Sequence, residues 1–427
     1  MFDFYRNVDD DTSRPVWKWH ILGHVCQRWR RIVLASPHRL NLQILCTRST
    51  PARKLLYIWP ALPIVLSYYS RSIRSNADDA IAALEHPNRV CNVTLDVTGP
   101  VLEKMAKEMQ VPFPVLTQLY IVITPGVGNT LPREFLGESA PSLQEIYLYG
   151  VPYPSLPRLL LSASNLVELL LRNIPPTGYI SPEAMVVGLA ALPKLKFFSI
   201  EYQSVSSRPD RIHPPPATRT VLPSGMWLEF KGASEYLEGL VSLIDCPQME
   251  WTCINYFNQF ADFQASQLSQ FIDRSVGPQA TLFRHATVSF SRRVVSFILS
   301  PHANHEGHVC ITTICEGIDW QVSHMTHLVS QFSVALFNVV HLNLTNLSNL
   351  EGQSEGMDDL EWRDLLHLFS AVKTLHVSRK LTEHVSLALE DITGGMVLPS
   401  LDSIRLTGQP VSSVKKLLAR RRLSSTL

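Results

Sequence analysis

One arrangement of apolar and polar positions recurs along most of the chain. The arrangement is apolar-x-x-apolar-x-apolar, and it occurs five times between residues 90 and 200 and three times between residues 339 and 406. Its first positions are separated by 26, 27, 23 and 29 residues in the first group and by 33 and 29 in the second. The eight copies are Val90/Val93/Leu95, Leu116/Leu119/Ile121, Leu143/Ile146/Leu148, Leu166/Leu169/Leu171, Leu195/Phe198/Ile200, Val339/Leu342/Leu344, Val372/Leu375/Val377 and Leu401/Ile404/Leu406.

Each copy ends in an apolar-x-apolar segment, which predicts a strand with one buried face, and the rest of the period has room for a returning helix. Self-similarity at this period is typical of a solenoid, and the core of the pattern matches leucine-rich repeats. The Asn or Cys that usually follows is mostly absent, although Asn173 and Asn346 come near that position. An ordinary domain of alternating strands and helices is the alternative. Several copies have a proline two residues ahead, namely Pro114, Pro141, Pro193 and Pro399.

The segment from Trp17 to Ser36 has a different period. Its apolar residues recur at i, i+3/i+4 and i+7, which predicts an amphipathic helix. Pro15 and Pro37 are suitable boundaries for it. Such a helix must bury its apolar stripe against other elements, so we expect Trp29 to be a buried anchor of a small helical module. On periodicity alone the better interpretation is a core helix of an ordinary domain.

The amino-acid sequence of this helix is more informative about the protein family than the spacing of its apolar residues. Leu22-x-x-Val25-Cys26-x-x-Trp29-Arg30-x-Ile32 resembles the C-terminal half of an F-box, and residues 36–69 resemble the segment that follows the F-box in fungal F-box proteins with leucine-rich repeats. The resemblance implies the substrate-recognition subunit of a Skp–cullin–F-box ubiquitin ligase. Such a subunit binds a Skp-type adaptor, and through it a cullin, and presents a protein target for ubiquitin-dependent degradation. The adaptor-binding residues would be Leu22, Val25, Cys26, Trp29 and Ile32.

We therefore expect an α/β chain with a short helical F-box-like module followed by an irregular leucine-rich-repeat solenoid. The expected divisions are a partial F-box-like module at 1–60, a connector at 61–89 and the solenoid at 90–427, with a proline-rich loop near 203–225. An unidentified protein target would bind the concave strand face, where polar residues between the apolar ones point outward. Examples of such residues are Thr94, Tyr120, Tyr147 and Arg405.

Other segments carry weaker signals. Strand-like patterns occur at 226–230, 253–257 and 286–290, and residues 234–244 look helical. The basic segment 411–423 predicts a helix that caps the last repeat, because the ends of a solenoid need covering.

One feature of the F-box is missing from the sequence. An F-box normally opens with a Leu-Pro-x-Glu helix, and no such motif precedes Trp17. The alternative function is therefore a repeat scaffold that binds a protein partner, with a degenerate F-box and no role in ubiquitin transfer.

Composition and charge narrow the class of protein. Of the 427 residues 45% are hydrophobic and 18% charged, which is typical of a folded chain. The 38 basic and 37 acidic residues give a net charge of +1, which favours neither a nucleic-acid nor a membrane-surface partner. Seven cysteines without a CxxC pair indicate reduced thiols, so we expect no disulfide and an intracellular protein, cytoplasmic, nuclear or both. The longest apolar run, residues 55–66, contains two prolines and is too short to span a bilayer.

No catalytic motif is complete. Gly126-Val-Gly128 lacks the third glycine of a dinucleotide fingerprint, there is no G-x-S-x-G, and His305-Glu-Gly-His308 is one residue short of H-E-x-x-H. A cluster of potential zinc ligands comprises His302, His305, His308, Cys310 and Cys315, but its spacing matches no structural zinc pattern. It is better read as loop histidines followed by a strand that carries Val309 and Ile311. We expect no enzyme activity, cofactor or metal.

Overall fold

The computed structural model describes residues 25–35, 44–47, 52–58, 62–69, 77–124, 130–204, 218–222, 226–247, 249–257, 265–276, 283–302, 309–315, 318–347, 359–390, 397–407 and 424–426. The chain divides into two compact units. Unit 1 comprises residues 1–180 and 187–195, and unit 2 comprises residues 181–186 and 196–427. The predicted loop residues 205–217 and the predicted helix at 411–423 lie outside the described part.

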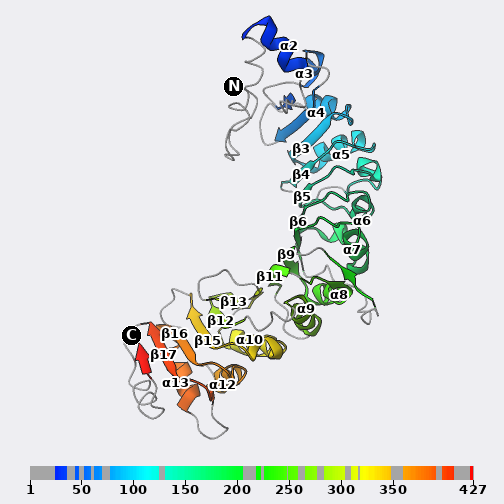
Figure 1. Ribbon diagram of the computed structural model, residues 1–427. Coiled ribbons are helices and arrows are strands. Elements are labelled where there is room, and N and C mark those ends of the chain that lie inside the picture. The colour runs from blue at the N-terminus through cyan, green and yellow to red at the C-terminus, as the bar shows by residue number, and fades with distance from the viewer. Residues whose placement is uncertain are drawn as a thin grey trace. The chain divides into compact units, whose positions relative to one another are not determined.

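Unit 1 contains a parallel sheet whose strands follow one another in chain order. The strands are β1 (Ile44–Cys46), β2 (Ile64–Tyr69), β3 (Val90–Val97), β4 (Gln118–Ile123), β5 (Glu145–Tyr149) and β6 (Glu168–Ile174). The helical elements are α2 (Gln27–Ala35), α3 (Ala52–Ile58), α4 (Ala77–Leu84), α5 (Gly99–Glu108), η2 (Phe135–Glu138), α6 (Leu156–Leu160) and η3 (Pro176–Gly178), while α7 (Pro182–Leu189) has residues in both units. Helices α4, α5 and α6 lie along one side of the strands (Figure 1).

The strand order decides between the two architectures that the repeat pattern left open. A doubly wound sheet reverses its strand order at a switch point, whereas β1 to β6 pair strictly in sequence. Consecutive helices α3, α4 and α5 also contact one another, which places them in one layer. Unit 1 is therefore an α/β repeat sheet, with one parallel strand in each repeat.

The burial of the repeat positions agrees with the sequence pattern. Of the 24 apolar positions in the eight copies, every one is buried except Leu406, which is half-buried. In each copy the second and third apolar residues lie in a strand, and the first lies just before that strand or, in the case of Val90, at its start. The apolar-x-apolar segment thus gives each strand one face in the core, as its period predicted.

Two of the prolines ahead of the repeats take part in contacts between neighbouring repeats. The carbonyl of Pro114 accepts a hydrogen bond from Ser142 Oγ at 2.6 Å, and the carbonyl of Pro141 accepts one from Asn165 Nδ2 at 2.9 Å. Proline has no N–H to donate but keeps its carbonyl acceptor. One repeat therefore supplies the acceptor and the next repeat the polar side chain.

The parallel sheet begins before Val90, where the repeat pattern starts. Strand β2 pairs with β3, and β1 pairs with β2, both in parallel. We expected residues 61–89 to be a connector. They instead contain strand β2, which belongs to the repeat sheet, and helix α4. The pattern missed them because β2 reads IVLSYY, with a tyrosine at its third buried position.

Unit 2 has a mixed sheet, in the order β7-β9-β11-β14-β13-β12-β15-β16-β17-β18. Its strands are β7 (Phe197–Tyr202), β9 (Met226–Gly232), β11 (Met249–Tyr256), β12 (His285–Phe290), β13 (Val294–Ser300), β14 (Val309–Ile314), β15 (His341–Asn346), β16 (Thr374–Ser378), β17 (Ser403–Thr407) and β18 (Ser424–Thr426), and β8 (Thr220–Val221) pairs with β10 (Ile244–Asp245) separately. The helices are α8 (Ser234–Leu243), α9 (Ser266–Val276), α10 (Ile318–Ser330), α11 (Ser333–Leu336), α12 (Asp359–His367), η5 (Arg379–Leu381) and α13 (Thr382–Glu390).

An antiparallel insertion explains why the repeat period is lost in the middle of the chain. Strand β13 pairs antiparallel with both β12 and β14, and these three strands lie between β11 and β15 in reversed order. Strand β14 pairs parallel with β11, and β12 pairs parallel with β15, so the parallel sheet continues on either side. The predicted strands at 226–230, 253–257 and 286–290 and the predicted helix at 234–244 correspond to β9, β11, β12 and α8.

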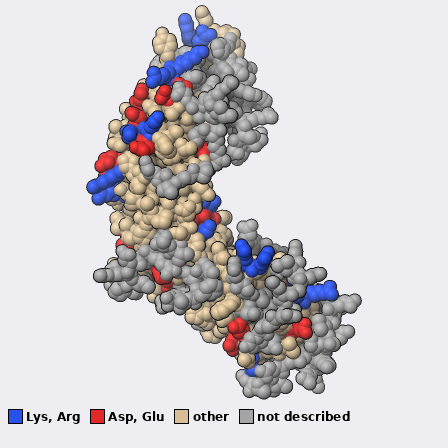
Figure 2. All heavy atoms as spheres, turned by 180° about the vertical axis from the view of Figure 1, so that it is seen from behind, with Lys and Arg blue, Asp and Glu red and all other residues tan. Residues whose placement is uncertain are grey.

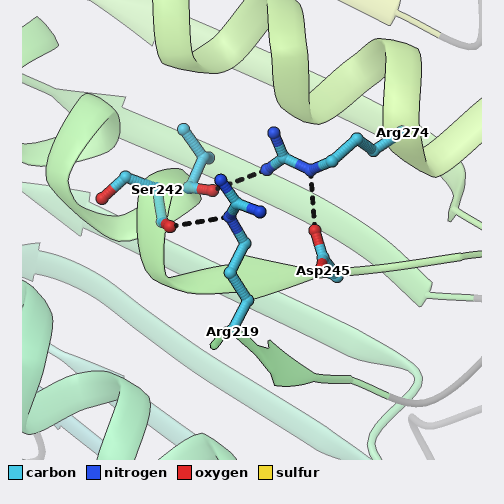
Figure 3. A network of polar contacts seen from close by, with 5 residues as sticks. Arg219, Ser242, Asp245 and Arg274 are labelled. Carbon is cyan, nitrogen blue, oxygen red and sulfur yellow. Dashed lines mark hydrogen bonds and ion pairs between the residues drawn. The ribbon is translucent and has the colours of Figure 1, made fainter. Parts of the chain in front are cut away.

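Two arginines hold the C-terminal end of α8 (Figure 3). Arg219 Nε donates to the carbonyl of Ser242 at 3.0 Å, and the guanidinium of Arg274 donates to the carbonyl of Val241 at 3.3 Å. Arg274 Nε also forms an ion pair with Asp245 Oδ1 at 2.7 Å. The last carbonyls of a helix lack intrahelical partners and carry partial negative charge, which cations stabilise. This network is therefore a structural helix cap.

Candidate interaction surface

The strands of unit 1 present one face that the described helices do not bury. Alternate residues of β3 to β6 point to this side, because successive side chains of a strand face opposite directions. We call this side the open face and define it by three rows of paired residues. The rows are Asn92/Gln118/Glu145/Glu168, Ser67/Thr94/Tyr120/Tyr147/Leu170 and Tyr69/Asp96/Val122/Tyr149/Arg172.

The middle row carries an aromatic pair. Tyr120 and Tyr147 occupy paired positions on β4 and β5, and their rings stack with centroids 4.3 Å apart and an interplanar angle of 5°. Tyr120 is 40% exposed. The pKa of Tyr147 is raised, first by its burial and second by its interaction with Tyr120. Tyr69 and Tyr149 in the third row are also exposed. Exposed tyrosines offer rigid apolar area together with a hydroxyl, a combination that is enriched at protein interfaces.

The first row forms a chain of hydrogen bonds across three strands. Asn92 Nδ2 donates to Gln118 Oε1, and Gln118 Nε2 donates to Glu145 Oε2 at 3.0 Å. The orientation of both amides is set by this chain, which ends at a carboxylate. Glu168 is paired with Glu145 on the next strand, and its pKa is raised by burial and then by the charge of Glu145. Two neighbouring carboxylates that repel each other favour a cationic group between them.

The N-terminal helix presents apolar side chains to solvent. Val25 lies just before α2 and is 57% exposed, Ile32 is 41% exposed, Cys26 is exposed and Trp29 is half-buried. Among the side chains of this helix that the structure describes, Val33 is the buried one, at 0% exposure. We expected Trp29 to be the buried anchor, but it is half-buried, and Val33, one turn later on the helix, is buried. Leu22 lies outside the described residues.

Three of the four surface residues predicted from the sequence lie together in the structure, and the fourth does not. Thr94, Tyr120 and Tyr147 occupy consecutive paired positions on β3, β4 and β5, as expected for one strand face. Arg405 belongs to β17 of unit 2, where it is exposed and pairs in register with His376. It therefore belongs to a different part of the sheet.

The amide–carboxylate row was missed by the sequence reasoning. Each of its four residues stands directly before the second apolar position of a repeat. Aligning the repeats on that position would have placed Asn92, Gln118, Glu145 and Glu168 in one row, because equivalent residues of parallel neighbours lie side by side.

Candidate chemistry outside these surfaces is limited. Val309 and Ile311 are buried in β14, as predicted, whereas His305 and His308 lie outside the described residues. Among the described residues no three His, Cys, Asp or Glu side chains form a group that could hold a metal ion. Figure 2 shows basic and acidic side chains interspersed among the described atoms of the face in view. Within the described part, no helix has the length and apolarity needed to cross a membrane.

Comparisons with known proteins add little to this description. No protein-family model matches the chain, and no curated protein matches it. Among solved structures, the chain is similar to the leucine-rich repeat-containing protein LegL7 from Legionella pneumophila, with 15% identity over 76% of this chain and 95% of that chain and a TM-score of 0.30. A TM-score this low carries no argument, so the α/β repeat architecture rests on the strand order and burial described above.

Proposed function

We propose that the chain is the substrate-recognition subunit of a Skp–cullin–F-box type ubiquitin ligase. In this proposal the N-terminal helix binds a Skp-type adaptor through Val25, Cys26, Trp29 and Ile32, together with Leu22, and the open face of unit 1 binds the protein target. The chain itself catalyses nothing and holds the target near a ubiquitin-charged enzyme, which is a proximity effect.

One observation supports the proposal that the N-terminal helix binds a Skp-type adaptor. Val25 and Ile32 are seven residues apart, and Trp29 lies between them, so all three share one face of the helix. Two of them are exposed although they are apolar, whereas Val33 of the same helix is buried. Exposed apolar side chains grouped on one helix face are typical of a surface that a partner covers.

The target half rests on the open face. The stacked pair Tyr120/Tyr147 supplies apolar area, and the carboxylates of Glu145 and Glu168 supply negative charge beside it. Aromatic anchors flanked by polar groups are the usual composition of binding hot spots. This surface supports binding of a target segment with a basic side chain next to an apolar one.

Binding of the purified full-length chain to a purified Skp-type adaptor tests the adaptor half. The variant Val25→Asp/Ile32→Asp places charge on the exposed face, and we expect at least roughly tenfold weaker binding, because burying an unpaired charge is costly. Gln27→Asp is the matched control, because Gln27 is exposed on the opposite side of the same helix. Equal binding by the double variant and the control would refute the assignment.

The alternative is a repeat scaffold that binds a protein partner and has no ubiquitin role. Its signature is a wild-type chain that fails to bind the adaptor but captures a protein partner in a manner that depends on Tyr120 and Tyr147. Substituting both tyrosines with serine separates the two functions, because it leaves the N-terminal helix unchanged.

A further inference from the structure

Two cysteines from distant parts of the sequence meet on neighbouring strands of unit 2. Cys253 of β11 and Cys310 of β14 are directly paired in the parallel register. Both are half-exposed, and both point away from the core, since their strand neighbours Thr252, Ile254 and Ile311 are buried. Directly paired residues of adjacent strands lie about 4.8 Å apart, within the range of Cα separations that a disulfide spans.

The polar surroundings of the two thiols favour ionisation of one of them. Cys253 and Cys310 occupy directly paired positions, and Thr312 Oγ1 lies 3.9 Å from Cys310 Sγ. Hydrogen bonding from Cys253, and to a smaller extent from Thr312, stabilises a thiolate at Cys310 and outweighs the opposing effect of burial, which lowers the pKa of Cys310 to about 7. The pKa of Cys253 is raised by the same hydrogen bond, by burial and by the charges of Cys310 and Glu229. Asn255 Nδ2 also lies 3.8 Å from Cys253 Sγ, which orients that sulfur.

We propose that Cys253 and Cys310 form a cross-strand dithiol that a hydroperoxide oxidises to a disulfide joining β11 to β14. The thiolate of Cys310 attacks the peroxide, the O–O bond breaks, and Cys310 becomes a sulfenic acid while the leaving oxygen takes up a proton to give an alcohol or water. The sulfur of Cys253 then attacks the sulfur of Cys310, the S–O bond breaks and water leaves. In total the two thiols lose two hydrogen atoms and the hydroperoxide is reduced.

The other buried and half-exposed cysteines among the described residues lack this arrangement. Cys46, Cys246 and Cys315 are buried, and burial raises the pKa of Cys46 and Cys246 to about 12 and that of Cys315 to about 11. Cys91 is half-exposed on β3 like the dithiol residues, but its Sγ donates to the carbonyl of Ile64 at 3.4 Å and burial raises its pKa. The thiolate is the reactive form, so Cys91 is a matched comparison of similar exposure and lower reactivity.

The test treats the reduced full-length protein with hydrogen peroxide near pH 7, then alkylates the remaining thiols and maps them by mass spectrometry. Cleavage after Glu250 separates Cys253 from Cys246, and fragment spectra distinguish Cys310 from Cys315. We expect a cross-linked peptide containing Cys253 and Cys310, lighter by about 2 Da than the two reduced peptides. Cys310 should be lost roughly tenfold faster than Cys91, because far more of it is thiolate.

Two variants distinguish the roles of the pair. Cys253→Ser should stop oxidation at a sulfenic acid on Cys310, which a sulfenic-acid probe such as dimedone labels. Cys310→Ser should abolish the fast phase, and Cys91→Ser should leave both the rate and the cross-link unchanged. Oxidation of Cys310 and Cys91 at equal rates, or a Cys253→Ser protein without labelled Cys310, would overturn the proposal. All three substitutions are at half-exposed positions, and circular dichroism spectra that match the wild type verify that the variants are folded.

Discussion

At the scale of single residues, Glu238 is the clearest case of a buried charge with a structural purpose. This residue of α8 is 6% exposed, and its carboxylate accepts hydrogen bonds from the backbone N–H groups of Gln267 at 2.8 Å and Leu268 at 2.9 Å. Those N–H groups belong to the first turn of α9, where a helix has no internal acceptors. Glu238 therefore caps a helix that begins 28 residues later. Burial raises its pKa, and the hydrogen bonds offset part of that effect.

Glu238→Ala should lower the free energy of unfolding by about 2 kcal/mol, because it leaves two buried N–H groups without their acceptor. Glu238→Gln retains one acceptor oxygen but turns its NH2 group toward the other N–H, so it should cost less than Glu238→Ala while still losing one of the two hydrogen bonds. Urea denaturation of the full-length protein, followed by a probe in unit 2, measures both changes. Equal losses for the two variants would show that the carboxylate charge matters more than its acceptor atoms.

His324 makes unit 2 sensitive to acid. It is 9% exposed in α10, and burial, followed by the charge of His327, lowers its pKa from 6.5 to about 4. Between these values the unfolded chain binds a proton that the folded chain does not, so stability is complete above about pH 6.5 and falls as the pH drops toward 4. The loss is about 2–3 kcal/mol at the lower end.

His324→Leu should flatten this dependence, because leucine cannot take up a proton. His367→Gln serves as the control, since His367 is exposed in α12 of the same unit. Thermal unfolding of the three proteins at pH 7, 5.5 and 4.5 compares them. An unchanged slope in His324→Leu would assign the acid sensitivity to other groups.

At the scale of elements, the repeats are joined by contacts between equivalent positions. Neighbouring strands share backbone hydrogen bonds, the loops share the bonds from Ser142 and Asn165 to the proline carbonyls, and the open face shares the ring stack of Tyr120 and Tyr147. Each contact links one repeat to the next and none is internal to a repeat. The free energy of unfolding of the array therefore depends on the contacts between neighbouring repeats.

The stack of Tyr120 on Tyr147 should contribute a measurable coupling. In a double-mutant cycle with Tyr120→Ser and Tyr147→Ser, we expect a coupling energy of about 0.5–1.5 kcal/mol, typical of an aromatic pair. Chemical denaturation of the four proteins gives this value. Strictly additive losses would mean that the rings pack independently of each other.

At the scale of the whole molecule, the fold consists of two units with continuous cores built from successive strands and helices. A strand in such an array contacts its neighbours and few other elements. Damage in one repeat should therefore spread to adjacent repeats before it reaches distant ones.

Leu119→Ala tests this expectation in β4, where Leu119 is 2% exposed. Removing a buried leucine side chain costs about 2–5 kcal/mol. Hydrogen exchange should show lost protection in β3, β4 and β5, which pair with one another, and unchanged protection in β16 of unit 2. An equal loss in β16 would show that the two units unfold as one.

The sequence alone was sufficient to identify the buried core positions of the repeats. The apolar pattern identified eight strands and their buried faces, with Leu406 as the single half-buried exception, because the two-residue period of a strand is written directly in its side chains. It could not reveal the antiparallel strand β13, since a strand with one buried face has the same pattern in either direction. The half-burial of Trp29 and the full burial of Val33 in α2 also depend on neighbours that the helix period does not specify.

Some residues of the candidate sites could be grouped from the sequence, and others are brought together only in the structure. Thr94, Tyr120 and Tyr147 could be assigned to one face because their positions in the repeat are equivalent. The pairing of Cys253 with Cys310 and the capping of α9 by Glu238 join residues 57 and about 29 positions apart that share no repeat pattern. Only the tertiary structure brings them together, because strand pairing and helix packing are decided by burial of the whole sheet and not by local sequence.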